Sequence, residues 1–229
     1  MALVKSEIIA PSSRGACVTA EATGGTRSAG RSSDSAWGIW EITETEQELG
    51  FIAMESCPEE IIAPAKRREF LAGRALIKTL VEKVGGEYTG IRKDEQGKPH
   101  LKDQKHEISL SHSSPYVAAQ IHLGGAVGID IEQPKEKLLR VASRVLSDEE
   151  EKDAGDDIVK HCIYWCAKEA MYKIHGKRGL HFNNQLNVDP FDMKRSGELR
   201  GYIRANGNPT VVSLAYVVKE DYVLVYTMP

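Results

Sequence analysis

Two helix-like segments on either side of a block of strand-like segments constrain the fold of this chain most strongly. Apolar residues recur at helical spacing over 64–84 and 156–175, with shorter helical runs at 45–54 and 138–146. The segments with the alternation or the β-branched content of strands are 37–42, 107–112, 116–122, 126–132, 211–218 and 222–226. This order predicts an α+β fold made of two similar α/β lobes.

The pattern divides the chain into three parts. Residues 1–35 are rich in Ser, Gly, Ala and Thr, and we interpret them as a loop-like or partly disordered lead-in, because they offer little to bury. We expect an N-terminal lobe over 36–125 and a C-terminal lobe over 126–229. A turn at 123–125 also predicts that the segments 116–122 and 126–132 pair as a hairpin.

Composition excludes several functional classes. The net charge of −3 gives no general attraction to nucleic acid or to an anionic membrane. No apolar run approaches the roughly 20 residues that span a bilayer, and the first residues lack the apolar core of a secretory signal. The four cysteines contain no Cys-x-x-Cys pair, so we expect neither a disulfide framework nor a zinc knuckle, and a cytoplasmic location.

The strand-like segment 126–132 carries two acidic residues on one face. Side chains alternate along a strand, so Asp130 and Glu132 point the same way and lie about 6.5–7 Å apart. Both carboxylates can reach one hard cation or its water ligands. The alternative is a strand with one solvated face, on which Asp and Glu only add solubility.

The helix-like segment 156–175 carries a second set of charges. Trp165, Glu169 and Lys173 follow one another at intervals of four and share a face, while Cys162 and Cys166 belong to the apolar stripe. Glu169 and Lys173 can form an ordinary surface ion pair of about 0.3–0.5 kcal/mol. The functional alternative gives Glu169 to a metal ion and Lys173 to a phosphate.

Basic and small residues elsewhere suggest phosphate contacts. A turn at Gly97-Lys98-Pro99 presents a lysine, a strand ends at Ser111-His112-Ser113, and the helix 64–84 begins with Lys66-Arg67-Arg68. Neighbouring Ser and His in a strand point opposite ways, which argues against a serine-hydrolase pair. The chain also lacks a P-loop and a Gly-x-Gly-x-x-Gly fingerprint. Taken alone, His112 is equally well a surface histidine.

In this order, these stretches resemble the signature of the 4′-phosphopantetheinyl transferase superfamily. The matching stretches are Gly97-Lys-Pro99, Ser111-His-Ser113, Val127-Gly-Ile-Asp-Ile-Glu132, Trp165-Cys-Ala-Lys-Glu-Ala-Met-Tyr-Lys173 and the helical Phe70-Leu-Ala-Gly-Arg74. The resemblance extends from Trp37 to the C-terminus. The length is similar to that of the longer, monomeric, two-lobed members of the surfactin-synthetase-activating type, whose lobes are related by a pseudo-twofold axis.

The resemblance implies a set of site residues. Asp130, Glu132 and Glu169 would hold Mg²⁺, or Mn²⁺ in its place, on the diphosphate of coenzyme A, with Lys168 and Lys173 near the phosphates. The remaining contacts to coenzyme A would come from Ser111 and His112 at the 3′-phosphate, from one of Lys66, Arg67 and Arg74 beside them, and from Gly97, Lys98 and Pro99 along the adenine.

The resemblance also implies the reaction, which is a holo-[acyl-carrier-protein] synthase activity. A serine of an apo acyl or peptidyl carrier protein would attack coenzyme A, with Glu169 and Lys173 as the catalytic residues and Glu169 accepting the serine proton. Two alternatives stay open from the residues alone. One is a metal-dependent phosphodiesterase acting on coenzyme A, and the other is a non-catalytic module that binds a carrier protein or a nucleotide.

Overall fold

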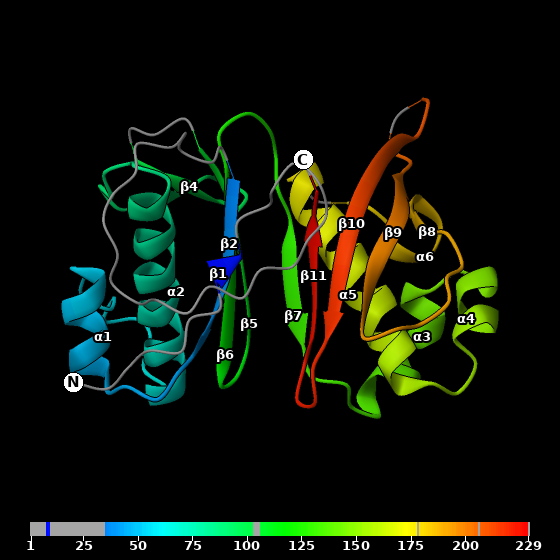
Figure 1. Ribbon diagram of the computed structural model, residues 1–229, viewed down its shortest axis with the longest axis horizontal. Coiled ribbons are helices and arrows are strands. Elements are labelled where there is room, and N and C mark those ends of the chain that lie inside the picture. Colours follow the sequence, from blue (N-terminus) through cyan, green and yellow to red (C-terminus); the bar gives the residue numbers. More distant parts are fainter. Residues whose placement is uncertain (1–7, 10–34, 103–105, 178, 206, 229) are drawn as a thin grey trace. The chain divides into compact units, whose positions relative to one another are not determined.

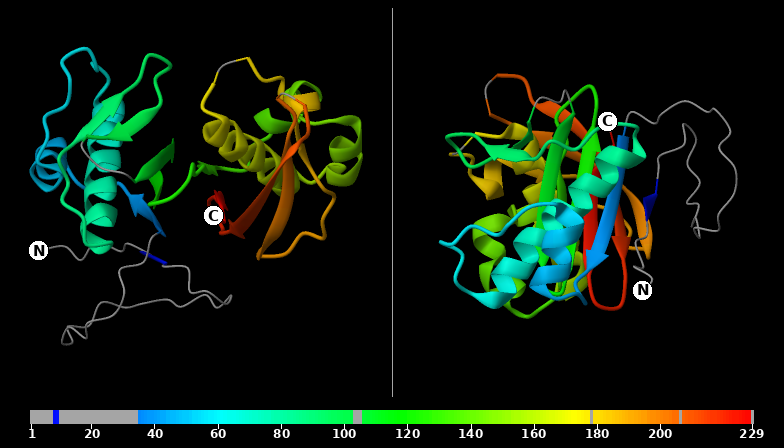
Figure 2. Two further views of the ribbon diagram at one scale, coloured as in Figure 1. Left: turned by 90° about the horizontal axis from the view of Figure 1, so that it is seen from above. Right: turned by 90° about the vertical axis from the view of Figure 1, so that its left-hand side faces the viewer.

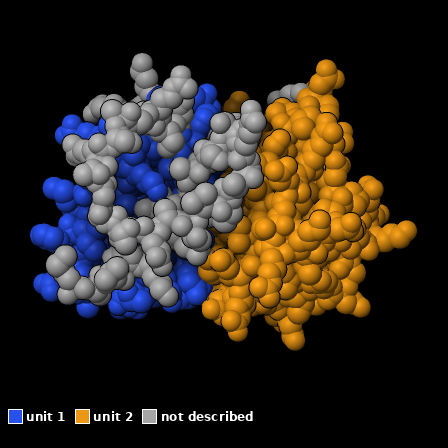
Figure 3. All heavy atoms as spheres, in the orientation of Figure 1, with its two compact units in different colours: residues 1–92, 99–125 blue, residues 93–98, 126–229 orange. Residues whose placement is uncertain are grey.

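The chain forms two compact units, each built from helices and antiparallel strands. The computed structural model describes residues 8–9, 35–102, 106–177, 179–205 and 207–228. Unit 1 comprises 1–92 and 99–125, and unit 2 comprises 93–98 and 126–229 (Figure 3). The predicted α+β fold is confirmed, whereas the pseudo-twofold relation of the lobes stays a prediction. Among the described residues, no helix is long and apolar enough to cross a membrane.

Unit 1 consists of a four-stranded sheet with a long helix on it. The sheet has the order β1-β2-β6-β5, and a separate two-stranded sheet joins β3 and β4. The elements are β1 (Ile8–Ile9), β2 (Ser35–Glu41), α1 (Glu46–Ala53), α2 (Pro64–Lys83), β3 (Ile91–Lys93), β4 (Pro99–Leu101), β5 (Glu107–Ser113) and β6 (Tyr116–His122). Helix α2 packs on β2 and β6, and α1 packs on α2 (Figure 1). The predicted lead-in at 1–35 lies outside the described residues, apart from β1 and Ser35.

Local sequence signals explain where the helices of unit 1 begin. Thr45 forms a capping box with Glu48 at the start of α1, which satisfies two backbone N–H groups of the first turn. Pro64 opens α2, where its missing N–H has no cost and its fixed φ suits the helix. Helix α2 then buries an apolar face that includes Leu71, Leu76 and Leu80 against the sheet.

The predicted hairpin of 116–122 with 126–132 is wrong. Strand β6 pairs with β2 on one edge and with β5 on the other, so it has no free edge for the next strand. The segment after the 123–125 turn instead supplies β7 (Ile129–Glu132), which pairs with β11 in another sheet. The hairpin partner of β6 is β5, joined to it through Ser114 and Pro115.

Unit 2 consists of a five-stranded sheet of order β7-β11-β10-β9-β8 and its helices. The further elements are α3 (Lys137–Val145), α4 (Asp148–Ala154), α5 (Ile158–His175), α6 (Phe182–Gln185), β8 (Leu186–Val188), β9 (Ser196–Ile203), β10 (Thr210–Val218) and β11 (Val223–Thr227). Helix α5 crosses the sheet and contacts all five of its strands, and α3 and α4 pack on α5 (Figure 2). The predicted hairpin of β10 and β11 is confirmed.

Helix α5 positions the chemistry of unit 2, and its ends are well defined. The Asp157 side chain accepts hydrogen bonds from the backbone N–H groups of Val159 and Lys160. At the other end, Gly176 adopts the left-handed conformation that ends many helices. Between these caps, Cys162 and Cys166 lie in the core without any solvent exposure, as the apolar stripe predicted.

Candidate functional site

Strand β7, which carries Asp130 and Glu132, is called the acidic strand below. Helix α5 touches the backbone of the chain at Gly128, just before this strand begins. A Cβ atom built on Gly128 would lie 1.9 Å from the carbonyl oxygen of Ala170, far inside van der Waals contact. The space beside Gly128 is therefore filled by the backbone of α5. Because Ala170 follows Glu169, this contact brings the acidic residues of β7 close to the acidic residue of α5.

Asp130 and Lys173 form an ion pair from the strand to the helix. Asp130 is 5% exposed. The Lys173 ammonium donates to Asp130 Oδ1 at 2.7 Å and to the carbonyl oxygen of Ile129 at 2.8 Å. Lys173 is therefore committed to the acidic strand and does not form the simple surface pair with Glu169 that was the alternative.

Glu169 lies close enough to the acidic strand for the charges to interact. Desolvation raises the pKa of the Glu169 carboxyl to about 7, and the negative charges of Asp130 and Glu132 add to this rise. Lys173 acts in the opposite direction, because its positive charge favours the ionised carboxylate. The Glu169 carboxylate is thus repelled by Asp130 and Glu132, and a cation among the three carboxylates would relieve this repulsion.

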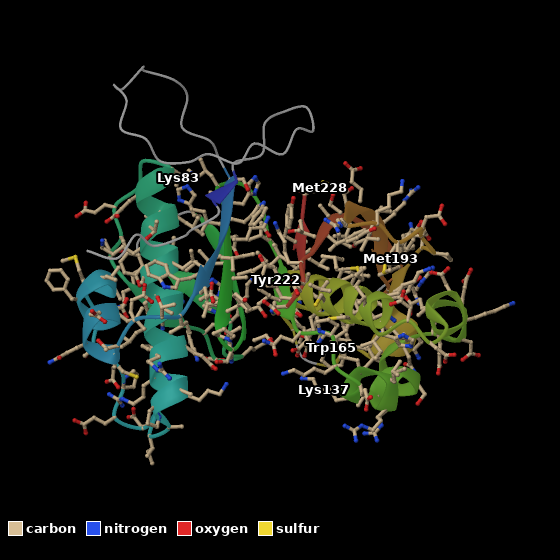
Figure 4. The ribbon with its side chains drawn as sticks, turned by 60° about the horizontal axis from the view of Figure 1, so that its bottom comes forward. Lys83, Lys137, Trp165, Met193, Tyr222 and Met228 are labelled. Atoms are coloured by element: carbon tan, nitrogen blue, oxygen red, sulfur yellow. The ribbon has the colours of Figure 1, made fainter. Side chains whose placement is uncertain are left out.

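Glu132 interacts with a second lysine, which sequence reasoning did not single out. The ammonium of Lys137 lies 3.1 Å from Glu132 Oε2, and the other carboxylate oxygen accepts from the backbone N–H of Gln133. Lys137 is the first residue of α3, five positions after Glu132 along the chain. Figure 4 labels Lys137 on α3 and Trp165 on α5. Trp165 lies one helical turn before Glu169.

The donor chemistry of Asp130, Glu132 and Glu169 fits a hard divalent cation. Carboxylate oxygens are the ligands that Mg²⁺ prefers in proteins. Within the described ranges, however, no three acidic, histidine or cysteine side chains already form a group able to hold a metal ion. Two lysines lie on the carboxylates instead, so binding a cation requires Lys173 and Lys137 to adjust.

Lys168 departs from the phosphate contact that the resemblance implied. Its side chain is fully buried, and its ammonium lies 2.5 Å from Glu150 Oε2. It also donates to the carbonyl oxygens of Val145 and Phe182, at 2.7 and 3.0 Å. All three N–H donors have acceptors within the protein, so this conformation leaves none for a phosphate.

In unit 1, two of the predicted basic residues converge on a buried carboxylate. Glu69 Oε2 lies 2.6 Å from the Lys66 ammonium and 3.3 Å from His112 Nε2. The carboxylate of Glu69 is buried, while the side chains of Lys66 and His112 are 58% and 55% exposed. Glu69 was not among the predicted residues, although its position three residues after Lys66 is a readable signal. Lys66 and His112 thus lie at one point of the surface of unit 1, where His112 adds a second positive charge when its imidazole is protonated.

The other two basic candidates have structural partners. Arg67 forms a two-pronged pair with Glu46 on α1 and donates to the carbonyl oxygens of Pro58 and Ile61. Arg74 is buried, lies 3.3 Å from Glu55 and stacks over the ring of Phe70 at 4.5 Å. We therefore favour Lys66 over Arg67 and Arg74 as the partner of His112.

The remaining predicted residues lie on β5 and in the turn between β3 and β4. Ser111 is buried on β5, next to His112 and opposite Ala118 of β6. The turn residue Gly97 has a positive φ of 89°. The backbone N–H of Lys98 donates to the Asp94 side chain, and Pro99 begins β4. Gly97 and Lys98 group with unit 2, whereas Pro99 groups with unit 1.

Comparisons with known proteins match both units. The description "4′-phosphopantetheinyl transferase superfamily" matches residues 126–227, which include β7 and α5. The description "4′-phosphopantetheinyl transferase N-terminal domain" matches residues 59–122, which include α2, β5 and β6.

One curated relative also matches. It is a Haemophilus influenzae protein named "Putative 4′-phosphopantetheinyl transferase", and it is 30% identical to this chain over 106 residues. The match covers 41% of this chain and 45% of the relative, so less than half of either protein is aligned. The two family matches cover separate and neighbouring parts of the chain, in the order N-terminal domain and then superfamily domain. The chain therefore belongs to the 4′-phosphopantetheinyl transferase superfamily, in the longer form that carries an N-terminal domain.

Proposed function

We propose that this chain transfers 4′-phosphopantetheine from coenzyme A to a serine of an apo acyl or peptidyl carrier protein, in a reaction that needs Mg²⁺. The observation that carries the proposal is the packing of α5 on β7, which pairs Lys173 with Asp130 and brings Glu169 within electrostatic range of Asp130 and Glu132. The family matches at this segment support a phosphopantetheinyl transfer over other phosphate chemistry. We also propose that the chain is monomeric and that it is located in the cytoplasm.

The reaction forms one bond and breaks another at the same phosphorus. The serine oxygen of the carrier bonds to the phosphorus that bears the pantetheine arm, and 3′,5′-ADP leaves with the electrons of the broken P–O bond. Glu169 is our candidate to accept the serine proton, because its carboxylate belongs to the proposed metal site, directly beside Ala170 where α5 contacts the strand. Lys173 lies where its positive charge can stabilise phosphate oxygens.

Asp130, Glu132 and Glu169 are the residues that we propose to hold the metal. A bound Mg²⁺ would neutralise the negative charge that builds up on the diphosphate. A divalent cation would also favour the ionised form of Glu169, because it offsets the two neighbouring carboxylates.

The direct test is incubation of the purified chain with coenzyme A, Mg²⁺ and a small panel of apo carrier proteins. The expected result is a carrier heavier by one phosphopantetheine group in the intact mass spectrum, and loss of this product when a chelator removes the metal. Release of phosphopantetheine without any carrier would support a phosphodiesterase. Carrier binding without a covalent product would support a non-catalytic module.

The residue pair of unit 1 leads to a more specific prediction. We propose that His112, with Lys66 and with Ser111 beside it, contacts the 3′-phosphate of coenzyme A. The His112→Ala variant is expected to bind coenzyme A about 10- to 150-fold more weakly, since one charge-assisted hydrogen bond contributes about 1.5–3 kcal/mol. Its affinity for 3′-dephospho-coenzyme A is expected to stay within about twofold of that of the unmodified chain, because that ligand lacks the phosphate. Titration calorimetry with both ligands measures the two affinities.

A matched control comes from the same sheet. His122 lies at the end of β6, and its ring contacts the carbonyl oxygen of Gly125. We expect His122→Ala to leave both affinities unchanged. Equal losses for the two ligands in His112→Ala would reject the assignment of His112 to the 3′-phosphate.

A further inference from the structure

Among the described residues of unit 2, the most deeply buried ion pair lies directly beside the candidate site and has no role in the proposed chemistry. Glu150 is 1% exposed and Lys168 is 0% exposed. Lys168 precedes Glu169 on α5, whereas Glu150 belongs to the first turn of α4. Burial of two full charges is costly unless every polar atom has a partner, so the hydrogen-bond partners of both side chains determine this cost.

The carboxylate of Glu150 is satisfied at both oxygens. Oε1 accepts the backbone N–H of Val188 on β8 at 2.8 Å. Oε2 accepts the backbone N–H of Ser147 at 2.7 Å, which completes a capping box at the start of α4, and it also receives the Lys168 ammonium. Glu150 thus joins a helix start, a strand and α5 at a single point.

The ammonium of Lys168 is equally committed. It reaches the last residue of α3 through the carbonyl oxygen of Val145 and the first residue of α6 through that of Phe182. Together with Glu150, it connects α5 to α3, α4, α6 and β8. These contacts oppose both a rotation of α5 about its axis and a shift along that axis, because either movement would break them.

The position of α5 determines where the side chains of Glu169 and Lys173 lie. Glu169 follows Lys168, and Lys173 lies five residues after Lys168 on the same helix. A rotation of α5 that moved Lys168 would move Glu169 and Lys173 relative to Asp130 by a similar angle. Replacement of a buried ion pair by apolar residues of the same shape is often neutral for stability, so geometry is the better explanation for its presence here.

We propose that Glu150 and Lys168 are positioning residues that set the rotation of α5 and thereby place Glu169 and Lys173 against the acidic strand. This inference rests on the proposed function and adds two residues to it. It differs from a direct phosphate contact of Lys168, because the structure gives all three of its donors to the protein. It also differs from a purely stabilising role, because it predicts a loss of rate in molecules that are fully folded.

The test uses the variants Glu150→Gln, Lys168→Met and the double variant, all close in shape to the native side chains. Either single variant leaves one buried charge without its partner and is expected to be less stable, whereas the double variant leaves none. The control is Lys160→Met. Lys160 also pairs from α5 to α4, with Asp153 at 2.8 Å, but it lies two turns before Lys168.

Transfer rates are measured at a temperature at which circular dichroism shows every variant to be folded. We expect kcat to fall about 30- to 100-fold in each single variant and by a similar factor in the double variant, as for a small misplacement of reacting groups. The Kd for coenzyme A is expected to stay within about threefold, and Lys160→Met is expected to keep kcat within about twofold. A readout independent of activity is amide hydrogen exchange, which should speed up over 168–175 in Lys168→Met and not in Lys160→Met.

Each contrary outcome rejects a different statement. An unchanged kcat in the folded double variant would reject the positioning role and leave Glu150 and Lys168 as structural residues. A large rise in the Kd for coenzyme A in Lys168→Met, but not in Glu150→Gln, would restore the phosphate contact. If the unmodified chain transfers nothing to any carrier, the proposed function fails, whereas the hydrogen-exchange comparison still supports or rejects the control of α5 by this pair.

Discussion

Replacement of Asp130 by alanine is expected to reduce transfer by about 10²- to 10³-fold or more while the chain still folds. Asp130 is buried on β7, where its carboxylate faces Lys173 and raises the pKa of Glu169. Its loss removes a proposed metal ligand and the partner that orients Lys173. Lys173 is itself a quarter exposed, so its ammonium can take up water and the cost in stability stays modest.

Glu169→Ala tests the same idea from the helix. We expect a loss of similar size, because the variant removes the proposed base and the third carboxylate. Transfer is followed by the mass increase of an apo carrier, and folding by circular dichroism. Glu151→Ala is the control, since Glu151 is an exposed acidic residue of α4 in the same unit. A rate near that of the unmodified chain in Asp130→Ala or Glu169→Ala would remove the metal site from the proposal.

The sequence allowed prediction of the parts of the site that depend on local periodicity. Strand alternation placed Asp130 and Glu132 on one face, and helical spacing placed Glu169 and Lys173 on one side of α5. Helix α5 formed close to the predicted 156–175, since Asp157 and Gly176 cap its ends, whereas the strand predicted over 126–132 is shorter and begins at Ile129. The meeting of strand and helix came from the resemblance, because alternation alone does not bring distant segments together.

The features that sequence analysis missed depend on tertiary contacts. The resemblance implied that Lys168 lies near the phosphates, yet its side chain is buried and held by residues of α3, α4 and α6. Its partner Glu150 was readable as the last position of a Ser-x-x-Glu capping box, but that signal indicates only a helix start. The pairing of β7 with β11 likewise depends on which sheet edges are free.

Gly128→Ala is expected to have the largest effect on stability of any change considered for this chain. Overpacking of a core usually costs about 1–3 kcal/mol, and more where no side chain can move aside. The methyl group at Gly128 would meet backbone atoms, with the carbonyl oxygen of Ala170 at 1.9 Å and its carbonyl carbon at 2.7 Å. We therefore expect unfolding to become easier by more than about 3 kcal/mol, which exceeds the gain of about 0.4–1 kcal/mol from a less flexible unfolded chain.

Gly201→Ala provides the comparison, because it adds the same methyl group on another strand that faces α5. There the new atom would meet the sulfur of Met171 at 2.4 Å, and a methionine side chain can change rotamer where a backbone cannot. We expect a cost of about 1–2 kcal/mol for Gly201→Ala, with both values taken from urea unfolding curves of equal slope. If Gly128→Ala proves as stable as Gly201→Ala, the strand and the helix do not need their close contact. The proximity of Asp130 to Glu169 would then require another cause, and the geometric basis of the proposed metal site would be lost.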